Sequence, residues 1–446
     1  MAFWLLNRIE EYSERKAIIC EGKDYSYRDL AGLVEAWRSR IGEAAIGTGR
    51  VVALVGDFSA ETCAAFLALI DGRNIVVPLT PSAYNKNPEF LDIAEVQFIL
   101  RPDASTDVEE LPVKIANPLN KDLTKAGKPG LVLFSSGSTG ASKAALHDLT
   151  SLLEKFRGRR SALRTMIFLT LDHIGGVNTF FHVIANGGTV VTTSDRTPGN
   201  VCKVIQETGI ELLPVSPTFL NLMLFSGEHR NYDLGSLKKI TYGTEPMPQS
   251  TLDQMNSEFP GVVLQQTYGL SELGILRSKS RKDDSLWVKV GGEGFKTRVI
   301  DGVLWIKSRS AMLGYLNAPS PFDEEGWFNT RDVVEVDGDH IRILGRDSEI
   351  INVGGEKVFP TEVENHVLEI DNIKDVIVFG EAHSLTGQMV VASVNLFEKE
   401  LNRDVKKRIR MSLRKKVAPF KIPQKVIITE DVHFNERFKR MRLRRT

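Results

Sequence analysis

A short segment rich in hydroxyls and glycines carries the clearest chemistry in the sequence. It starts with the apolar run Leu131–Phe134, continues as Ser-Ser-Gly-Ser-Thr-Gly-Ala-Ser and closes with Lys143. Glycines let backbone N–H groups approach phosphate oxygens, hydroxyls donate hydrogen bonds, and the ammonium group adds positive charge. Because an apolar strand feeds directly into this loop, we interpret it as a phosphate cradle and not as a flexible Ser/Gly turn.

The spacing of this loop differs from that of a P-loop. A Walker A motif needs a glycine followed directly by Lys and then Ser or Thr, whereas Lys143 follows Ser142 and precedes Ala144. The sequence therefore predicts a nucleotide site of another type.

Further motifs follow this loop in chain order. They are YGTEPMP at Tyr242–Pro248, YGLSE at Tyr268–Glu272, GWFNTRD at Gly326–Asp332, and Gly345-Arg346 leading into INVGGEKVFPTEVE at Ile351–Glu364. As a set, these motifs resemble those of the adenylate-forming superfamily, which includes acyl- and aryl-CoA synthetases, peptide-synthetase adenylation domains and luciferases. The resemblance extends over roughly residues 25–446.

The resemblance implies roles in nucleotide and metal binding for five residues. Tyr268 offers its face to adenine, Ser271 hydrogen-bonds the α-phosphate, and Glu272 supplies a hard oxygen ligand to Mg²⁺. Asp332 accepts both ribose hydroxyls, which the lone pairs of an ionised carboxylate allow. Arg346 adds a contact to the ribose or a phosphate.

The same resemblance gives a complete set of expected site residues. The expected catalytic residues are Lys439, Glu272, Lys143 and His173. Glu272 is also the expected metal ligand. The residues expected to contact the cofactors are Ser135, Ser136, Gly137, Ser138, Thr139, Gly140, Lys143, Gly243, Thr244, Glu245, Tyr268, Gly269, Ser271, Asp332, Arg346, Gly354 and Gly355. Of these, Gly354 and Gly355 are expected along the path of a pantetheine arm.

The segment Leu171–Asn178 resembles the acyl-pocket motif, in which His173 gates or orients the substrate carboxylate. Ile174 stands where amino-acid-activating relatives have an aspartate, and a substrate ammonium buried beside Ile174 would lack a partner. We therefore expect a plain carboxylic acid. Gly175 and Gly176 predict room for its ring or chain.

The resemblance implies that a fatty or aryl acid is activated by ATP with Mg²⁺ to acyl-AMP and then transferred to the thiol of coenzyme A. An alternative acceptor is the phosphopantetheine of an acyl carrier protein, because both thiols end the same pantetheine arm. Arg331 and Phe438 replace family glycines before Asp332 and Lys439, and Ser271 replaces the usual threonine. These departures leave open a catalytically weak adenylate-binding protein.

The composition argues against several classes of protein, namely nucleic-acid-binding, zinc-binding, disulfide-rich and membrane-spanning proteins. Lys and Arg number 57, as do Asp and Glu, so no net charge attracts nucleic acid. Cys20, Cys63 and Cys202 lack the spacing of a zinc site or a disulfide framework. The sequence has no run of about 18 apolar residues, as a membrane span requires. We expect a cytoplasmic protein without a membrane span.

The elements that must position these residues follow an alternating pattern. Apolar β-branched runs separated by amphipathic stretches occur at Val51–Val55, Ile75–Pro78, Met166–Leu169, Thr189–Thr193 and Ile240–Tyr242. This pattern predicts an α/β fold of βαβ units with largely parallel sheets. Ligands of such sheets bind beyond the carboxyl ends of the strands.

The pattern changes after about Gly291, where short strands and the turn signals Asp301-Gly302 and Asp337-Gly338 predict antiparallel hairpins. We therefore expect an N-terminal adenylate-forming domain over residues 1–346, with a β-rich subdomain at about 291–346. Residues 347–446 predict a small α+β C-terminal domain. The resemblance implies that this domain is mobile and changes its face between the two steps.

Overall fold

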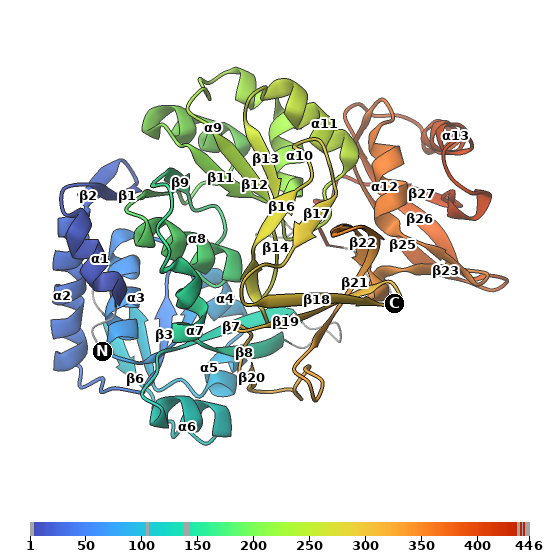
Figure 1. Cartoon of the computed structure of the whole chain (residues 1–446). Helices are drawn as coiled ribbons and strands as arrows, with labels where there is room; N and C mark the ends of the chain where they lie inside the picture. The colour runs from blue at the N-terminus through green and yellow to red at the C-terminus, as the bar shows by residue number, and fades with distance from the viewer. Residues whose placement is uncertain (1–3, 104–106, 137–141, 435–437, 439, 442–446) are drawn as a thin grey trace.

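Two seven-stranded sheets form the large N-terminal part of the molecule (Figure 1). The computed structural model describes the chain except residues 1–3, 104–106, 137–141, 435–437, 439 and 442–446. The strands of the first sheet, in spatial order, are β13 (Val263–Gln266), β12 (Lys239–Tyr242), β11 (Leu212–Val215), β9 (Arg164–Met166), β10 (Thr189–Thr192), β1 (Lys16–Cys20) and β2 (Lys23–Ser26). Those of the second are β20 (Gly314–Tyr315), β8 (Ser142–Asp148), β7 (Gly130–Ser136), β4 (Ile75–Leu79), β3 (Val51–Val55), β5 (Phe98–Arg101) and β6 (Asp107–Glu110).

Both sheets are parallel in their centres, and antiparallel pairs occur only toward one edge of the first sheet and toward both edges of the second. In the first sheet only the pairing of β1 with β2 is antiparallel, and in the second sheet β6, β8 and β20 pair antiparallel to their neighbours. The predicted α/β class is therefore confirmed. The antiparallel hairpin of β7 and β8 carries the predicted phosphate loop between its strands.

The helices between the sheets share one core with them. This core includes Trp37 of α2 (Tyr27–Glu43), Phe66 of α3 (Ala60–Asp71), Phe180 of α8 (Ile174–Ala185) and strand residues such as Leu54. Side chains cap the first turns of two of these helices. Ser26 and Asp29 form a capping box at the start of α2, and Ser59 caps α3. Helix α1 (Trp4–Tyr12) packs against α2 and α8.

Other helices cover the outer faces. The core of the first sheet is completed by α9 (Pro198–Thr208), α10 (Pro217–Ser226) and α11 (Gln249–Glu258). The outer face of the second sheet is covered by α4 (Pro81–Lys86), α5 (Glu89–Ala94) and α6 (Pro118–Lys125), whereas α7 (Leu149–Leu153) packs into the core between the sheets.

An antiparallel β-rich part follows, after a small hairpin of β14 (Tyr268–Leu270) and β15 (Gly274–Leu276). Its strands, in spatial order, are β16 (Ser278–Ser280), β17 (Val288–Val290), β22 (His340–Arg346), β21 (Phe328–Asp337), β19 (Val303–Ser308) and β18 (Phe295–Ile300). The sheet begins before Gly291 because β16 and β17 pair as a hairpin. The hairpins predicted at Asp301-Gly302 and Asp337-Gly338 are both present.

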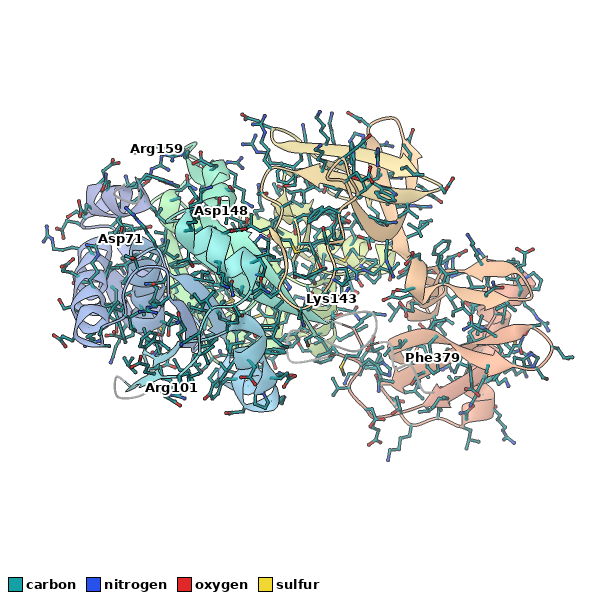
Figure 2. The ribbon with its side chains drawn as sticks, turned by 90° about the horizontal axis from the view of Figure 1, so that it is seen from below. Asp71, Arg101, Lys143, Asp148, Arg159 and Phe379 are labelled. Carbon is teal, nitrogen blue, oxygen red and sulfur yellow. The ribbon has the colours of Figure 1, made fainter. Side chains whose placement is uncertain are left out.

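The C-terminal part has a hydrophobic core of its own. Its strands are β23 (Ile351–Val353), β24 (Glu356–Val358), β25 (Ile373–His383), β26 (Gly387–Leu396) and β27 (Lys425–Ile428), and its helices are α12 (Pro360–Leu368) and α13 (Asn402–Leu413). A short helical turn at Asp347–Glu349 joins it to β22. In the view of Figure 2, Lys143 lies between Asp148, on the same strand, and Phe379 of the C-terminal part.

None of the helices in the described ranges has both the length and the apolar content that a membrane crossing requires.

Candidate active site

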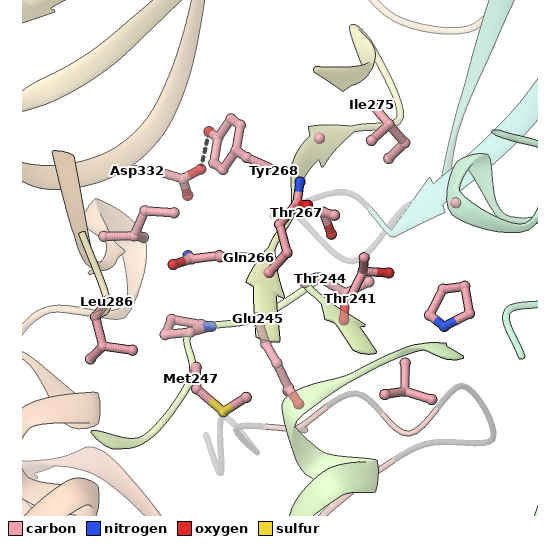
Figure 3. Close-up of a pocket in the computed structure, with 18 of the residues that line it drawn as sticks. Thr241, Thr244, Glu245, Met247, Gln266, Thr267, Tyr268, Ile275, Leu286 and Asp332 are labelled. Carbon is pink, nitrogen blue, oxygen red and sulfur yellow. Dashed lines mark hydrogen bonds between the residues drawn. The ribbon is translucent and has the colours of Figure 1, made fainter. Parts of the chain in front are cut away.

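A cavity of about 1130 Å³ lies where the carboxyl ends of β11, β12 and β13 meet the β-rich part and the C-terminal part. This is the edge of a parallel sheet at which ligands bind. Figure 3 shows side chains that line this cavity, among them Thr241, Gln266 and Thr267 from the first sheet and its loops. Residues of β21, β22 and α12 close the opposite side.

Asp332 lies in this cavity on β21 and is only 6% exposed. Its Oδ2 accepts a hydrogen bond of 2.5 Å from the Tyr268 hydroxyl, drawn as a dashed line in Figure 3. Arg346 Nε lies 3.3 Å from the other oxygen, Oδ1. Burial raises the pKa of Asp332, while the charge of Arg346 and the Tyr268 hydroxyl act against that rise. A carboxylate held by two donors keeps further lone pairs for a diol.

Arg331 adopts the backbone conformation that the family's glycine would provide. Its φ is +59°, in the left-handed region, and its N–H donates to Asn329 Oδ1 at 2.8 Å. The side chain is exposed. Arg331 therefore keeps a left-handed backbone conformation at an irregular point of β21, although a residue with a Cβ atom is strained there.

We expect Arg331→Gly to raise the free energy of unfolding by roughly 0.5–1 kcal/mol, because relief of left-handed strain exceeds the added entropy of the unfolded chain. Chemical denaturation would measure this change. Arg331→Ala, which keeps a Cβ atom, is the matched control and should give no such gain. Equal effects of the two substitutions would contradict the strain account.

The hairpin after β13 presents Tyr268, Ser271 and Glu272 to the cavity. A Cβ atom on Gly269 would lie 2.8 Å from the carbonyl oxygen of Gly274, so the tight pairing of β14 with β15 requires glycine there. His147 supports this turn from β8, with its Nε2 2.7 Å from the carbonyl oxygen of Ser271. Burial lowers the pKa of His147 to about 4, so the neutral ring donates from Nε2.

Glu272 and Lys143 are linked through an aromatic residue that sequence reasoning missed. The Tyr315 hydroxyl donates to Glu272 Oε1 at 2.6 Å, and Lys143 Nζ lies 5.1 Å from the centre of the Tyr315 ring. Glu272 lines the cavity, and within the described residues no donor contacts its other oxygen. Glu272 thus retains a hard oxygen for a cation.

The loop Gly243–Glu245 follows the end of β12 and is conformationally constrained. A Cβ atom on Gly243 would lie 2.8 Å from the carbonyl oxygen of Thr267, and Thr244 has a φ of +73°. A β-branched residue in this region is an outlier that surrounding contacts must hold. Glu245 supplies such a contact, because its Oε1 accepts from the N–H of Thr218 at 2.7 Å.

Glu245 also links the large part of the molecule to the C-terminal tail. Its Oε2 accepts from the backbone N–H of Arg440 at 3.0 Å. The Arg440 guanidinium lies 3.3 Å from Glu364 and donates to the carbonyl oxygen of Val376 at 2.8 Å. The structure therefore gives Glu245 a bridging role beyond the nucleotide contact that the sequence predicts.

Phe438 fixes the tail from the other side of position 439. Its φ of +52° lies in the left-handed region, as expected of a position where relatives have glycine. Its ring centre lies 5.2 Å from that of Phe168 and 5.6 Å from that of Phe219, and its carbonyl accepts from Ser216 Oγ at 2.8 Å. Lys439 itself lies outside the described residues.

His173 caps the N-terminus of α8, where its Nδ1 accepts from the N–H of Gly175 at 2.9 Å, and it lines the cavity together with Ile174. The interpretation of Gly175 and Gly176 as spare room is wrong for Gly176, whereas Gly175 does line the cavity. A Cβ atom on Gly176 would lie 2.2 Å from the carbonyl oxygen of Thr170, so Gly176 allows close packing of helix and loop.

The cavity brings together most of the predicted site residues that the structure describes. Those that line it are Ser135, His173, Gly243, Thr244, Glu245, Tyr268, Gly269, Ser271, Glu272, Asp332 and Arg346. Lys143 lies beside Tyr315 and does not line the cavity. Gly354 and Gly355 form the turn between β23 and β24, with φ values of +62° and +92°, and are also absent from its lining. The side chain of Ser136 and residues 137–140 lie outside the description.

Sequence profiles and relatives identify the family. The profile of the AMP-binding enzymes matches residues 5–316, and that of the AMP-binding enzyme C-terminal domain matches residues 362–439. The chain is 26% identical to an indoleacetate–CoA ligase of Aromatoleum aromaticum, over 94% of this chain and 92% of that protein. It is also 26% identical to 4-coumarate–CoA ligase-like 2 of Arabidopsis thaliana, over 83% of this chain and 69% of that protein.

Solved structures agree with the fold. An anthranilate CoA ligase in complex with anthranoyl-AMP matches with a TM-score of 0.83 at 18% identity, covering 98% of this chain and 95% of that chain. The o-succinylbenzoate CoA synthetase of Bacillus subtilis, in complex with its acyl-adenylate intermediate, matches with a TM-score of 0.78 at 20% identity, over 99% and 97% of the two chains. The chain belongs to the AMP-binding enzyme family, within the adenylate-forming superfamily of acid–thiol ligases.

Proposed function

We propose that the enzyme uses ATP to convert a fatty or aryl carboxylic acid to acyl-AMP and then transfers the acyl group to the thiol of coenzyme A. The observation that carries this proposal is the single cavity that joins the buried carboxylate of Asp332 to the His173 end of α8. One end offers a diol acceptor, and the other offers a channel for an acid. The names of the curated relatives, which are CoA ligases, support the acceptor thiol.

In the first step, a substrate carboxylate oxygen attacks the α-phosphorus of ATP and pyrophosphate leaves. The carboxylate needs no general base, so the protein contributes position and positive charge. Asp332 and Tyr268 hold the nucleoside, His173 orients the acid, and Ser271 donates to the α-phosphate. Lys143 and Lys439 supply cations for the developing charge.

Glu272 would hold Mg²⁺, which neutralises phosphate charge when bound. The described residues contain no cluster of three or more His, Cys, Asp or Glu side chains suited to a metal ion. Magnesium in nucleotide sites is commonly held by one or two carboxylates together with substrate phosphates. The free oxygen of Glu272 fits that coordination.

In the second step, a thiol attacks the carbonyl carbon of the acyl-AMP and AMP leaves. Gly354 and Gly355 do not line the present cavity, so a role beside a pantetheine arm requires a different placement of the C-terminal part. The turn at Asp347–Glu349 contains Ser348 and is the candidate hinge. Such a movement would place the glycine turn at the thiol entrance.

The test is acid-dependent exchange between ATP and labelled pyrophosphate, followed by mass spectrometry of the thioester products. We expect exchange with at least one acid of a fatty, benzoic and cinnamic panel, and acyl-CoA once coenzyme A is added. Nucleotide binding without exchange would contradict this function and support a weak adenylate-binding protein. Transfer to holo-carrier protein but not to coenzyme A would contradict the proposed acceptor.

We expect Asp332→Asn to weaken ATP binding about 10- to 100-fold, because the ribose diol loses a charge-assisted acceptor. Isothermal titration would measure the affinity. Asp337→Asn is the control, since Asp337 lies at the exposed end of the same strand and pairs with Arg281 at 2.8 Å. Unchanged ATP affinity in folded Asp332→Asn would remove this carboxylate from the nucleotide site.

A further inference from the structure

The acid end of the cavity is a channel between one helix and the face of a sheet. Lys239 and Thr241 line it from alternate positions of β12, so both side chains lie on the same face of the sheet. Asn178 and His182 line it from positions of α8 that are one turn apart. The channel therefore runs along β12 and α8 together.

Two geometric measures give this channel the same length. A strand rises about 3.3 Å per residue, which places Lys239 about 13 Å from Gly243 at the phosphate end. A helix rises about 1.5 Å per residue, which places His182 about 13 Å from His173. An acid held at His173 would thus extend toward Lys239 and His182.

Cationic side chains gather at this far end. Arg160, His182 and Lys239 line the cavity, and Arg160 is exposed at its mouth. Lys239 Nζ lies 3.3 Å from Gln265 Oε1. Behind them, Lys155 Nζ donates to the carbonyl oxygen of Ile275 at 2.9 Å, and Ile275 also lines the cavity.

No protein carboxylate balances this cluster within the described part of the chain. Among the described residues, Arg160, His182 and Lys239 form no salt bridge within 4.0 Å of a carboxylate, in contrast to the neighbouring Lys238, which pairs with Glu211. Burial and the positive charges of Arg160 and Arg277 lower the pKa of Lys155 to about 7. Burial lowers the pKa of His182 to about 4, and Arg160, Lys155 and Lys239 add to that fall. Clustered like charges are costly in a folded protein unless an anion meets them.

We propose that the substrate is a dicarboxylic acid, whose second carboxylate is bound at the far end of the channel by Lys239, Arg160 and His182. This inference rests on the proposed acid activation and specifies its substrate class. Lys239 and Arg160 supply charge-assisted hydrogen bonds, and neutral His182 adds a ring N–H donor. The carboxylate at the His173 end is the one that reacts.

Pairs of acids that differ only in the distal carboxylate test this inference. Suberic acid is compared with octanoic acid, and para-carboxycinnamic acid with cinnamic acid, by kcat/KM of acid-dependent pyrophosphate exchange. In the pair that gives the faster exchange, kcat/KM for the diacid should exceed kcat/KM for the monoacid by about tenfold or more. Lys239→Met should remove most of that preference, which is measured as the ratio of kcat/KM for the diacid to kcat/KM for the matching monoacid.

Lys238→Met is the matched control, because Lys238 is exposed and pairs with Glu211 at 2.5 Å instead of facing the channel. It should retain the preference for the diacid. Better exchange with the monoacids, or an equal preference in Lys239→Met and wild type, would overturn the dicarboxylate site while leaving acid activation intact. Exchange with no acid of either kind would overturn the proposed function and this inference together.

Discussion

Replacing Lys439 by alanine should slow acyl-AMP formation from acid and ATP about 100- to 1000-fold, the loss expected when one preorganised donor to a transition-state oxygen is removed. The motivation is its place in the sequence between Phe438 and Arg440. Phe438 contacts Phe168 and Ser216 of the large part, and Arg440 bonds the cavity residue Glu245. The effect should appear in the rate of pyrophosphate exchange more than in KM, because transition-state contacts act on kcat.

The same variant should form thioester from supplied acyl-AMP at nearly the wild-type rate, since the C-terminal part would have turned away by then. Lys374→Ala is the control, as Lys374 is an exposed lysine of the same C-terminal part. Arg440→Ala is not neutral, because Arg440 anchors the tail to Glu364 and Val376. Full exchange activity in Lys439→Ala, or equal loss of both half-reactions, would remove Lys439 from the adenylation step.

Replacing Glu272 by glutamine should lower pyrophosphate exchange by about 100-fold at ordinary Mg²⁺ concentration, since an amide oxygen is a weaker ligand for a hard cation. The substitution preserves shape and still accepts the Tyr315 hydrogen bond, so folding should be retained. Raising the Mg²⁺ concentration should recover part of the rate. A titration of exchange rate against Mg²⁺ separates loss of metal affinity from loss of catalysis.

Two further variants sharpen the Glu272 test. Tyr315→Phe removes only the hydroxyl that orients the carboxylate, and should cost less than Glu272→Gln. Glu293→Gln changes an exposed glutamate in the β-rich part and should leave the Mg²⁺ dependence unchanged. Wild-type Mg²⁺ dependence in Glu272→Gln would place the metal elsewhere.

Local patterns in the sequence predicted the bounds of several central strands closely. The strand predicted at Val51–Val55 has the predicted bounds, and the one predicted at Ile75–Pro78 extends one residue further, to Leu79, because continuous burial marks both runs. The strand predicted at Met166–Leu169 is instead Arg164–Met166. Beyond it the chain stays buried but leaves the ladder for the loop that leads to His173, so hydrophobicity alone misplaces the strand.

The candidate site was predictable as a set of motifs but not as a network. The motifs predicted Asp332, Glu272 and Tyr268 as site residues, and all three line the cavity. The hydrogen bond from Tyr268 to Asp332 and the bridge from Glu245 to Arg440 join residues far apart in the chain. Such contacts depend on how the separate sheets pack, and no local pattern encodes them.

The cationic end of the channel illustrates the same limit. Lys155 and Arg160 lie on the segment before β9, His182 lies on α8 and Lys239 on β12, and none belongs to a motif. Their shared environment arises because α8 and β12 line one cavity, and a single sequence does not reveal this arrangement. Charge balance of the whole chain, with 57 residues of each sign, hides this local excess.

The most direct test of the account follows one oxygen atom through the reaction. A substrate acid carrying heavy oxygen in its reacting carboxylate is incubated with enzyme, ATP, Mg²⁺ and coenzyme A, and the nucleotide product is analysed by mass spectrometry. Attack of that carboxylate on the α-phosphorus, followed by thiol attack on the carbonyl carbon, predicts AMP that carries one heavy oxygen, with unlabelled pyrophosphate. Unlabelled AMP, or ADP with labelled phosphate, would contradict an acyl-AMP intermediate.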